Sequence, residues 1–112
     1  MIECISRDPA ETFAALGDPV RRAIVERLVE GDATVGELAS LFPISFQAVS
    51  KHVKVLGAAG VVTQRREGKT RPVHLEAAAL VAPVDWLEGH RRQLEERYER
   101  LDELLATTEE SR

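Results

Sequence analysis

The residues best suited to chemistry in this chain are a group of cations near its middle. Six lysines and arginines lie between residues 45 and 74, against a single acid, Glu67, so this segment carries a net charge of +5. Ammonium and guanidinium groups bind phosphate, and several of them on one face attract a polyanion such as nucleic acid. A solvated basic hairpin would have the same composition, so charge alone leaves both interpretations open.

The rest of the chain has the opposite charge. Residues 1–44 carry −4 and residues 75–112 carry −5, so the whole chain of 112 residues has a net charge of −4. This separation predicts one binding face, with repulsion keeping polyanions away from the remaining surface.

Length and composition predict a single globular domain over residues 1–112, because 44% of the residues are hydrophobic, 30% are charged and only 4% are aromatic. No apolar run approaches the ~20 residues of a membrane span, and the acidic opening does not suit a signal peptide, so we expect a cytoplasmic protein. The sequence has no glycine-rich phosphate loop and no paired nucleophile and base, so we predict that it is not an enzyme.

A helix is predicted from Ser45 to Gly60, and its two faces differ. At 100° per residue, Val49, Val53 and Leu56 share a narrow arc that must face the core. The opposite face holds Gln47, Ser50, Lys51, Lys54 and Ala58. Glutamine can bond adenine in two places and lysine can bond guanine or phosphate, so this acid-free face fits a DNA major groove. An exposed helix whose lysines only keep it soluble is the alternative.

Helix start signals define the elements before this helix. Asp-Pro pairs at residues 8–9 and 18–19 each predict an N-cap followed by a first helical residue. Thr34 and Glu37 predict a capping box. The residues expected to be buried behind it are Leu38, Leu41 and Phe42. This short helix and the next one, joined by a turn of about three residues, form a helix-turn-helix over about residues 34–60.

The segment from residue 61 to residue 75 is rich in β-branched residues and has Gly68 near its middle, which predicts a β-hairpin with a basic tip. A long helix follows over residues 83–106, about 36 Å at 1.5 Å per residue. Its apolar residues recur at steps typical of a heptad seam once Arg91 is counted into the row. This is more apolar surface than so small a core can cover, which predicts a partner helix.

Three segments, FAALGDPVRRAIVERL, TVGELASLFPISFQAVSKHVKVLGAAGVV and RREGKTRPVHL, resemble the ArsR family of bacterial winged-helix repressors over about residues 10–75. The resemblance implies a mainly α fold with a small β-hairpin: a winged helix-turn-helix with N- and C-terminal dimerisation helices. It also implies a homodimer on an inverted-repeat operator, with helix 45–59 in the major groove, residues 61–75 as the wing and helix 83–106 in the dimer interface.

The residues expected to bind double-stranded DNA are Ser45, Gln47, Ser50, Lys51, His52, Lys54, Arg65, Arg66, Lys69, Thr70 and Arg71. Those expected in the dimer interface are Phe13, Leu16, Val84, Leu87, Leu94, Tyr98, Leu101 and Leu105. His52 lies at the edge of the apolar arc, where a bond to the backbone or to a phosphate fits. Arg21 and Arg22 are expected to form ion pairs with Asp18 or Glu26.

Many ArsR proteins sense metals, but the matching positions here lack the ligands. Residues 37–41, in the helix before the predicted recognition helix, contain no thiolate, and neither Asp85 nor His90 begins a ligand set on the last helix. We therefore expect no metal and no cofactor, and spacing names no partner for His74. Cys4 is expected to be an ordinary thiol, although oxidation could join two copies in a dimer. The sequence leaves any small-molecule or redox effector open.

A dimeric adaptor that docks a protein partner, with no operator of its own, is the alternative function. An adaptor has no reason to exclude acids from the outer face of residues 45–58. The preferred hypothesis is a DNA-binding transcriptional regulator, with repression as the expected output.

Overall fold

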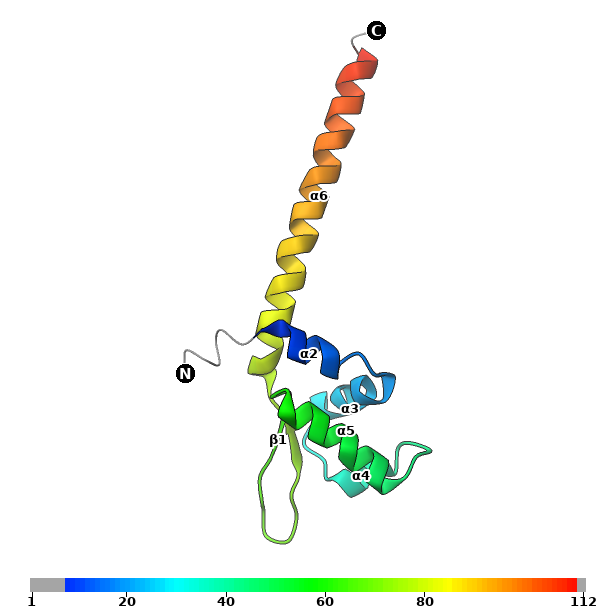
Figure 1. The fold of residues 1–112 in the computed structure, drawn as a ribbon, viewed down its shortest axis with the longest axis vertical. Coiled ribbons are helices and arrows are strands. Elements are labelled where there is room, and N and C mark those ends of the chain that lie inside the picture. Colours follow the sequence, from blue (N-terminus) through cyan, green and yellow to red (C-terminus); the bar gives the residue numbers. More distant parts are fainter. Residues whose placement is uncertain (1–7, 111–112) are drawn as a thin grey trace.

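The computed structural model describes residues 8–110 as a small helical body from which one long helix projects (Figure 1). Its radius of gyration is 20.3 Å, whereas a compact domain of this length would have about 13 Å. The difference arises because the long helix extends the molecule to 75 Å along its longest axis. Cys4 lies outside the described residues.

Three short helices begin the body, and local side chains start each of them. They are α2 (Pro9–Ala15), α3 (Pro19–Val29) and α4 (Val35–Ala39). Asp8 and Asp18 accept hydrogen bonds from backbone N–H groups in the first turns of α2 and α3, each with proline at the first helical position. Thr34 and Glu37 form the predicted capping box of α4.

The fourth helix, α5 (Phe46–Ala58), is capped by Ser45, whose hydroxyl accepts a hydrogen bond from the backbone N–H of Ala48, the third residue of the helix. The turn before it, residues 40–45, is longer than the predicted three residues. It begins tightly, since the N–H of Leu41 donates to the carbonyl of Leu38. The Leu41 side chain is 55% exposed, so the prediction that it is buried was wrong.

The predicted hairpin consists of β1 (Val62–Gln64) and β2 (Val73–Leu75), which pair antiparallel. The paired residues are Val62 with Leu75, Thr63 with His74 and Gln64 with Val73. The tip turns at Gly68, whose φ of +59° is a conformation that glycine adopts at no steric cost. Two hydrogen bonds between Ala33 and Val73 fasten the base of the hairpin to the helical body.

The core lies where α2, α3, α4, α5 and the hairpin meet. Its buried hydrophobic residues are Ala15, Ile24, Leu28, Ala33, Leu38, Val49, Val53, Leu56, Ala59, Val61, Val62 and Val73. Most come from helices that flank or form the helix-turn-helix, so the core fixes the orientation of α5.

A short 3₁₀ helix, η1 (Ala77–Leu80), leads directly into α6 (Val81–Glu110). At 30 residues α6 is longer at both ends than the predicted 83–106, and about 45 Å long at 1.5 Å per residue. Pro83 falls within its first turn, where the missing N–H would have had no intrahelical partner. Near its start α6 packs on α2 through an edge-to-face contact between Trp86 and Phe13, with ring centroids 5.8 Å apart.

Candidate nucleic-acid interface

The outward face of α5 is defined by the core on its other side. Val49, Val53 and Leu56 are buried, as predicted. Gln47, Lys51 and Lys54 are exposed and Ser50 is half-buried. The first turn holds no acid, so the partial positive charge of the helix N-terminus adds to that of the lysines and favours phosphate.

Phe46, which the sequence did not single out, also reaches solvent at the start of α5. Its spacing from Val49 and Val53 places it towards the core-facing arc, yet the side chain is 54% exposed. The reason is its position, since it is the first residue of the helix, directly after the turn of residues 40–45. The signal that could have revealed it is the N-cap Ser45, which places Phe46 at the helix end.

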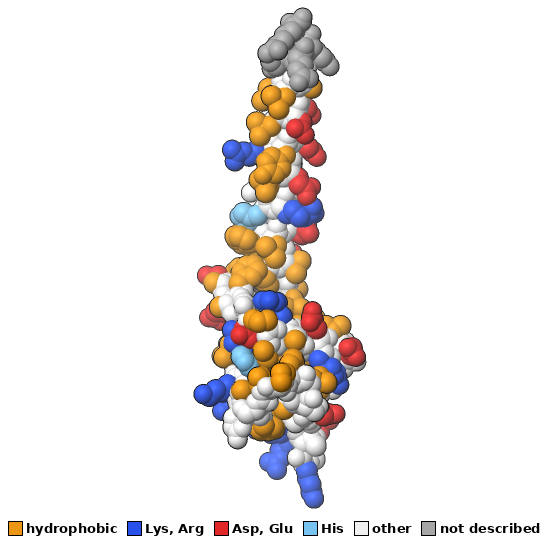
Figure 2. Space-filling model, turned by 90° about the vertical axis from the view of Figure 1, so that its right-hand side faces the viewer, with side chains coloured by type: hydrophobic (Ala, Val, Ile, Leu, Met, Phe, Trp, Pro, Cys, Tyr) orange, Lys and Arg blue, Asp and Glu red, His pale blue; other side chains and the backbone are white. Residues whose placement is uncertain are grey.

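The hairpin carries the remaining predicted cations. Arg65, Arg66, Lys69 and Arg71 are all exposed. The hydroxyl of Thr70 donates to the carbonyl of Glu67 at 2.9 Å, which closes the turn at the tip. In Figure 2, Lys and Arg side chains mark the lower end of the molecule, where Figure 1 places the hairpin. The structure thus leaves the basic side chains of α5 and of the hairpin free to meet a polyanion.

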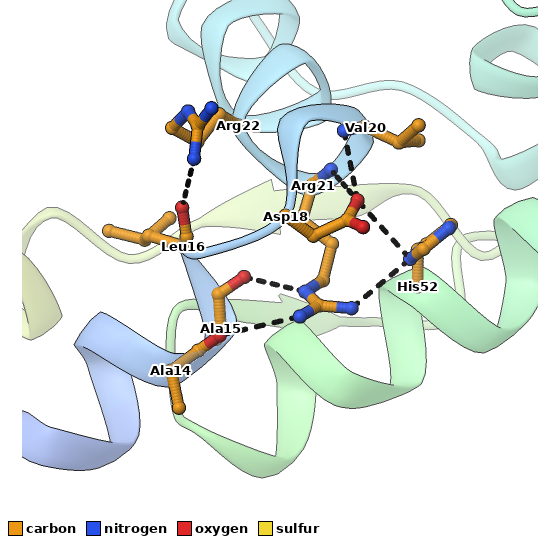
Figure 3. A network of polar contacts seen from close by, with 8 residues as sticks. All are labelled: Ala14, Ala15, Leu16, Asp18, Val20, Arg21, Arg22 and His52. Carbon is orange, nitrogen blue, oxygen red and sulfur yellow. Dashed lines mark hydrogen bonds and ion pairs between the residues drawn. The ribbon is translucent and has the colours of Figure 1, made fainter.

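His52 lies on α5 beside α3 and is half-buried. Its Nδ1 is 3.3 Å from Nη1 of Arg21 and 3.9 Å from a carboxylate oxygen of Asp18 (Figure 3). In the hydrogen bond with Arg21 the guanidinium is the donor and Nδ1 of His52 is the acceptor, because a guanidinium has no acceptor atom. The partners of His52 are therefore side chains of α3 and its N-cap rather than the backbone.

The two adjacent arginines near the start of α3 bind backbone carbonyls rather than acids. Nε of Arg21 donates to the carbonyl of Ala15 at 2.5 Å, and Nη1 of Arg22 donates to that of Leu16 at 2.8 Å (Figure 3). Among the described residues neither forms the predicted ion pair with Asp18 or Glu26. These bonds satisfy carbonyls at the C-terminal end of α2, which have no partners within the helix.

The contacts around Asp18 shift the pKa of its carboxyl group. Its pKa is lowered from the usual 3.8, first because the backbone N–H of Arg21 donates to the carboxylate. The nearby His52, the backbone N–H of Val20 and the charge of Arg21 lower it further, while desolvation opposes them. The carboxylate therefore remains charged at neutral pH and holds the start of α3.

The long helix α6 exposes a row of large apolar side chains, visible along the stalk in Figure 2. Its exposed members include Val84, Leu87, Leu94, Tyr98, Leu101 and Leu105, the positions predicted for the dimer interface. Arg91, which interrupts the row, bonds to Glu88 at 2.6 Å and to Glu95. These bonds lower the pKa of Glu88 and raise that of Arg91. Arg91 is thus held along its own helix.

Comparison with known proteins identifies the scaffold. The family described as "Helix-turn-helix domain" matches residues 16–65. The chain is 47% identical over 76 residues to the HTH-type transcriptional regulator Rv2034 of Mycobacterium tuberculosis, covering 68% of this chain and 71% of that protein. It is 35% identical over 75 residues to the transcriptional repressor SdpR of Bacillus subtilis, covering 67% and 83%.

A similar solved structure indicates which family the chain belongs to. The crystal structure of the ArsR family transcriptional regulator RHA00566 superposes with a TM-score of 0.71 at 34% identity, covering 77% of this chain and 94% of that one. The chain belongs to the ArsR family. It is a DNA-binding transcriptional regulator with a winged helix-turn-helix fold, as its sequence predicts, and not an enzyme.

Metal ligands do not gather in the described part of this ArsR-family chain. Among the side chains that the structure describes, no three His, Cys, Asp or Glu lie close enough together to hold an ion. His74 instead bonds Asp32 at 2.8 Å. His90 bonds the carbonyl of Trp86 at 2.8 Å and stacks on its ring. Among the same residues, no helix is both long enough and apolar enough to cross a bilayer.

Proposed function

We propose that this ArsR-family chain is a homodimeric repressor that binds an inverted-repeat operator without a metal-sensing site. The whole of residues 1–112 forms one DNA-binding domain. Within it α5 enters the major groove, the hairpin lies along neighbouring phosphates as a wing, and α2 and α6 form the dimer interface. The observation that carries the proposal is the acid-free outer face of α5, exposed beside a basic hairpin.

On α5, Gln47 is the proposed base reader, because its amide can bond an adenine edge at two points. Lys51 and Lys54 bind phosphate or guanine, and Ser45 and Ser50 add hydroxyl groups at the same surface. His52 can offer its Nε2–H to a phosphate because its Nδ1 faces Arg21. Five residues of the wing complete the set: Arg65, Arg66, Lys69, Thr70 and Arg71.

We propose that a second copy of the chain packs against the exposed apolar row of α6. Its apolar row repeats at heptad spacing, and the exposed fractions of the side chains in the row range from 46% at Leu101 to 63% at Leu105. Phe13, which contacts Trp86, continues this surface onto α2. Leu16, which follows the last residue of α2, lies partly buried against the core and extends this surface.

Repression is supported by the similarity to SdpR, a transcriptional repressor. The proposed lack of metal sensing rests on the residue types at the family's two metal-site positions. A shift of less than twofold in operator affinity upon adding Zn²⁺ is the expected result, and a large, chelator-reversible loss would contradict this part.

Fluorescence anisotropy tests the main proposal on DNA from upstream of the protein's own gene, with a scrambled duplex as control. A dimer with 6–10 phosphate contacts should lose ~10³–10⁵ in affinity between 50 and 200 mM salt. Tighter binding to the native fragment that persists at higher salt supports a sequence-specific repressor. Weak binding that is equal on both duplexes would favour the adaptor function instead.

A further inference from the structure

Phe46 is an exposed aromatic side chain at the start of a DNA-binding helix. Its side chain is 54% exposed, whereas Phe42 is partly buried against the core and Phe13 packs on Trp86. Leaving a phenyl ring in water forgoes the free energy that its burial would yield. The ring therefore has apolar surface available for a partner that reaches the first turn of α5.

The position of Phe46 within α5 indicates which partner that is. Residues at the N-terminal end of a recognition helix are those that reach base edges in the major groove. Phe46 directly precedes the proposed base reader Gln47 in the sequence, and it lies one turn before Ser50, which it adjoins on the helix surface. If α5 lies in the major groove, an exposed ring at its N-terminal end can reach the 5-methyl group of thymine, which is the apolar feature of that groove.

We propose that Phe46 is a specificity-determining residue that contacts the 5-methyl group of a thymine in each half of the operator. This inference rests on the proposed function, since it requires α5 to lie in the major groove. The contact buries one methyl group against the ring. A methyl-sized group contributes about fourfold in affinity, and two symmetric half-sites contribute about 15-fold.

Deoxyuridine provides the test because it lacks only the 5-methyl group of thymidine and pairs in the same way. An operator is first selected from random duplexes by the full-length protein. Each symmetric pair of thymines is then replaced by deoxyuridine, and affinity is measured for wild type and for Phe46→Ala. At one pair of positions wild type should lose about 15-fold, while Phe46→Ala should lose nothing further.

Two further variants secure the comparison. Phe46→Gln keeps a long side chain without an apolar end and should also lose its response to deoxyuridine. Val55→Ala is the matched control, because Val55 is an exposed apolar residue of α5 that lines a hollow facing Ala14 and Ala15 of α2. Val55→Ala should respond to deoxyuridine as wild type does.

The outcomes separate this inference from the proposed function. If wild type selects an operator but tolerates deoxyuridine at every position, the Phe46 contact is absent while the proposed function stands. An equal loss in wild type and in both Phe46 variants assigns the methyl group to another residue and overturns the inference. If no operator is selected, the proposed function fails, and the inference fails with it.

Discussion

Removing the two lysines of α5 tests the electrostatic reasoning directly. Lys51 and Lys54 are exposed on the outer face of the helix. A cation bound at a phosphate releases condensed counterions, which makes affinity fall with salt. The double variant Lys51→Ala/Lys54→Ala should therefore bind DNA more weakly, and salt should reduce its affinity less steeply.

The magnitude follows from the number of lysines. A homodimer presents four of them, and each phosphate contact contributes about 0.9 to the slope of log K against log salt, so the slope should become shallower by up to about 3.6. Between 50 and 200 mM salt, this makes the loss of affinity about 150-fold smaller than for wild type. Anisotropy titrations at four salt concentrations measure the slope with sufficient precision.

A matched control distinguishes contact from overall charge. Arg97→Ala/Arg100→Ala removes the same number of positive charges from exposed positions on α6. This variant should leave the slope of log K against log salt almost unchanged, because the two side chains lie on the projecting helix. An unaltered slope in the lysine variant, or an equal change in both variants, would refute the assignment of Lys51 and Lys54 to phosphate.

Three other predictions address the base reader, the dimer and the cap of α3. Gln47→Ala should reduce discrimination between operator and scrambled DNA by ~1–3 kcal/mol while sparing non-specific affinity; an equal drop on both duplexes would show that Gln47 reads no base. Leu101→Glu should place an unpaired charge in the α6 interface and yield monomers by sedimentation, and an intact dimer would remove this part of α6 from the interface. Asp18→Asn keeps a capping oxygen but not the charge. Because the folded-state pKa of Asp18 lies below its usual 3.8, the stability contributed by the charge is complete above that value and is lost as the pH falls through the folded-state pKa. The difference in unfolding free energy between wild type and Asp18→Asn should thus shrink on acidification, and a difference independent of pH would contradict the role of the charge.

The features that sequence predicted correctly are those decided within a few residues. Asp18, Thr34 and Ser45 each cap a helix by bonding an N–H two or three residues away, so the residue types alone indicate the caps. Heptad spacing likewise identified the apolar row of α6, but it did not locate the first and last residues of the helix. The helix continues to Glu110 because nothing in the sequence after Ala106 stops it.

Contacts between distant segments were not predictable in the same way. Arg21 was expected to form an ion pair with Asp18 or Glu26, yet it binds a carbonyl of α2 and His52, which is 31 residues further along. Its partners depend on how α2 and α5 approach α3, which only the assembled core determines. Phe46 was missed for a related reason, since helical periodicity assigns a face but does not show where the core ends.

The arrangement of charge explains how an acidic chain binds DNA. The C-terminal segment that carries −5 is largely α6, which projects away from the body at the end opposite the hairpin (Figure 1). Interactions between exposed charges are screened beyond about 8 Å at physiological ionic strength. Since α6 is about 45 Å long, most of its acids lie several screening lengths from α5. The negative charge of α6 therefore contributes little to the potential around α5 and does not oppose the binding of a polyanion beside the +5 of residues 45–74.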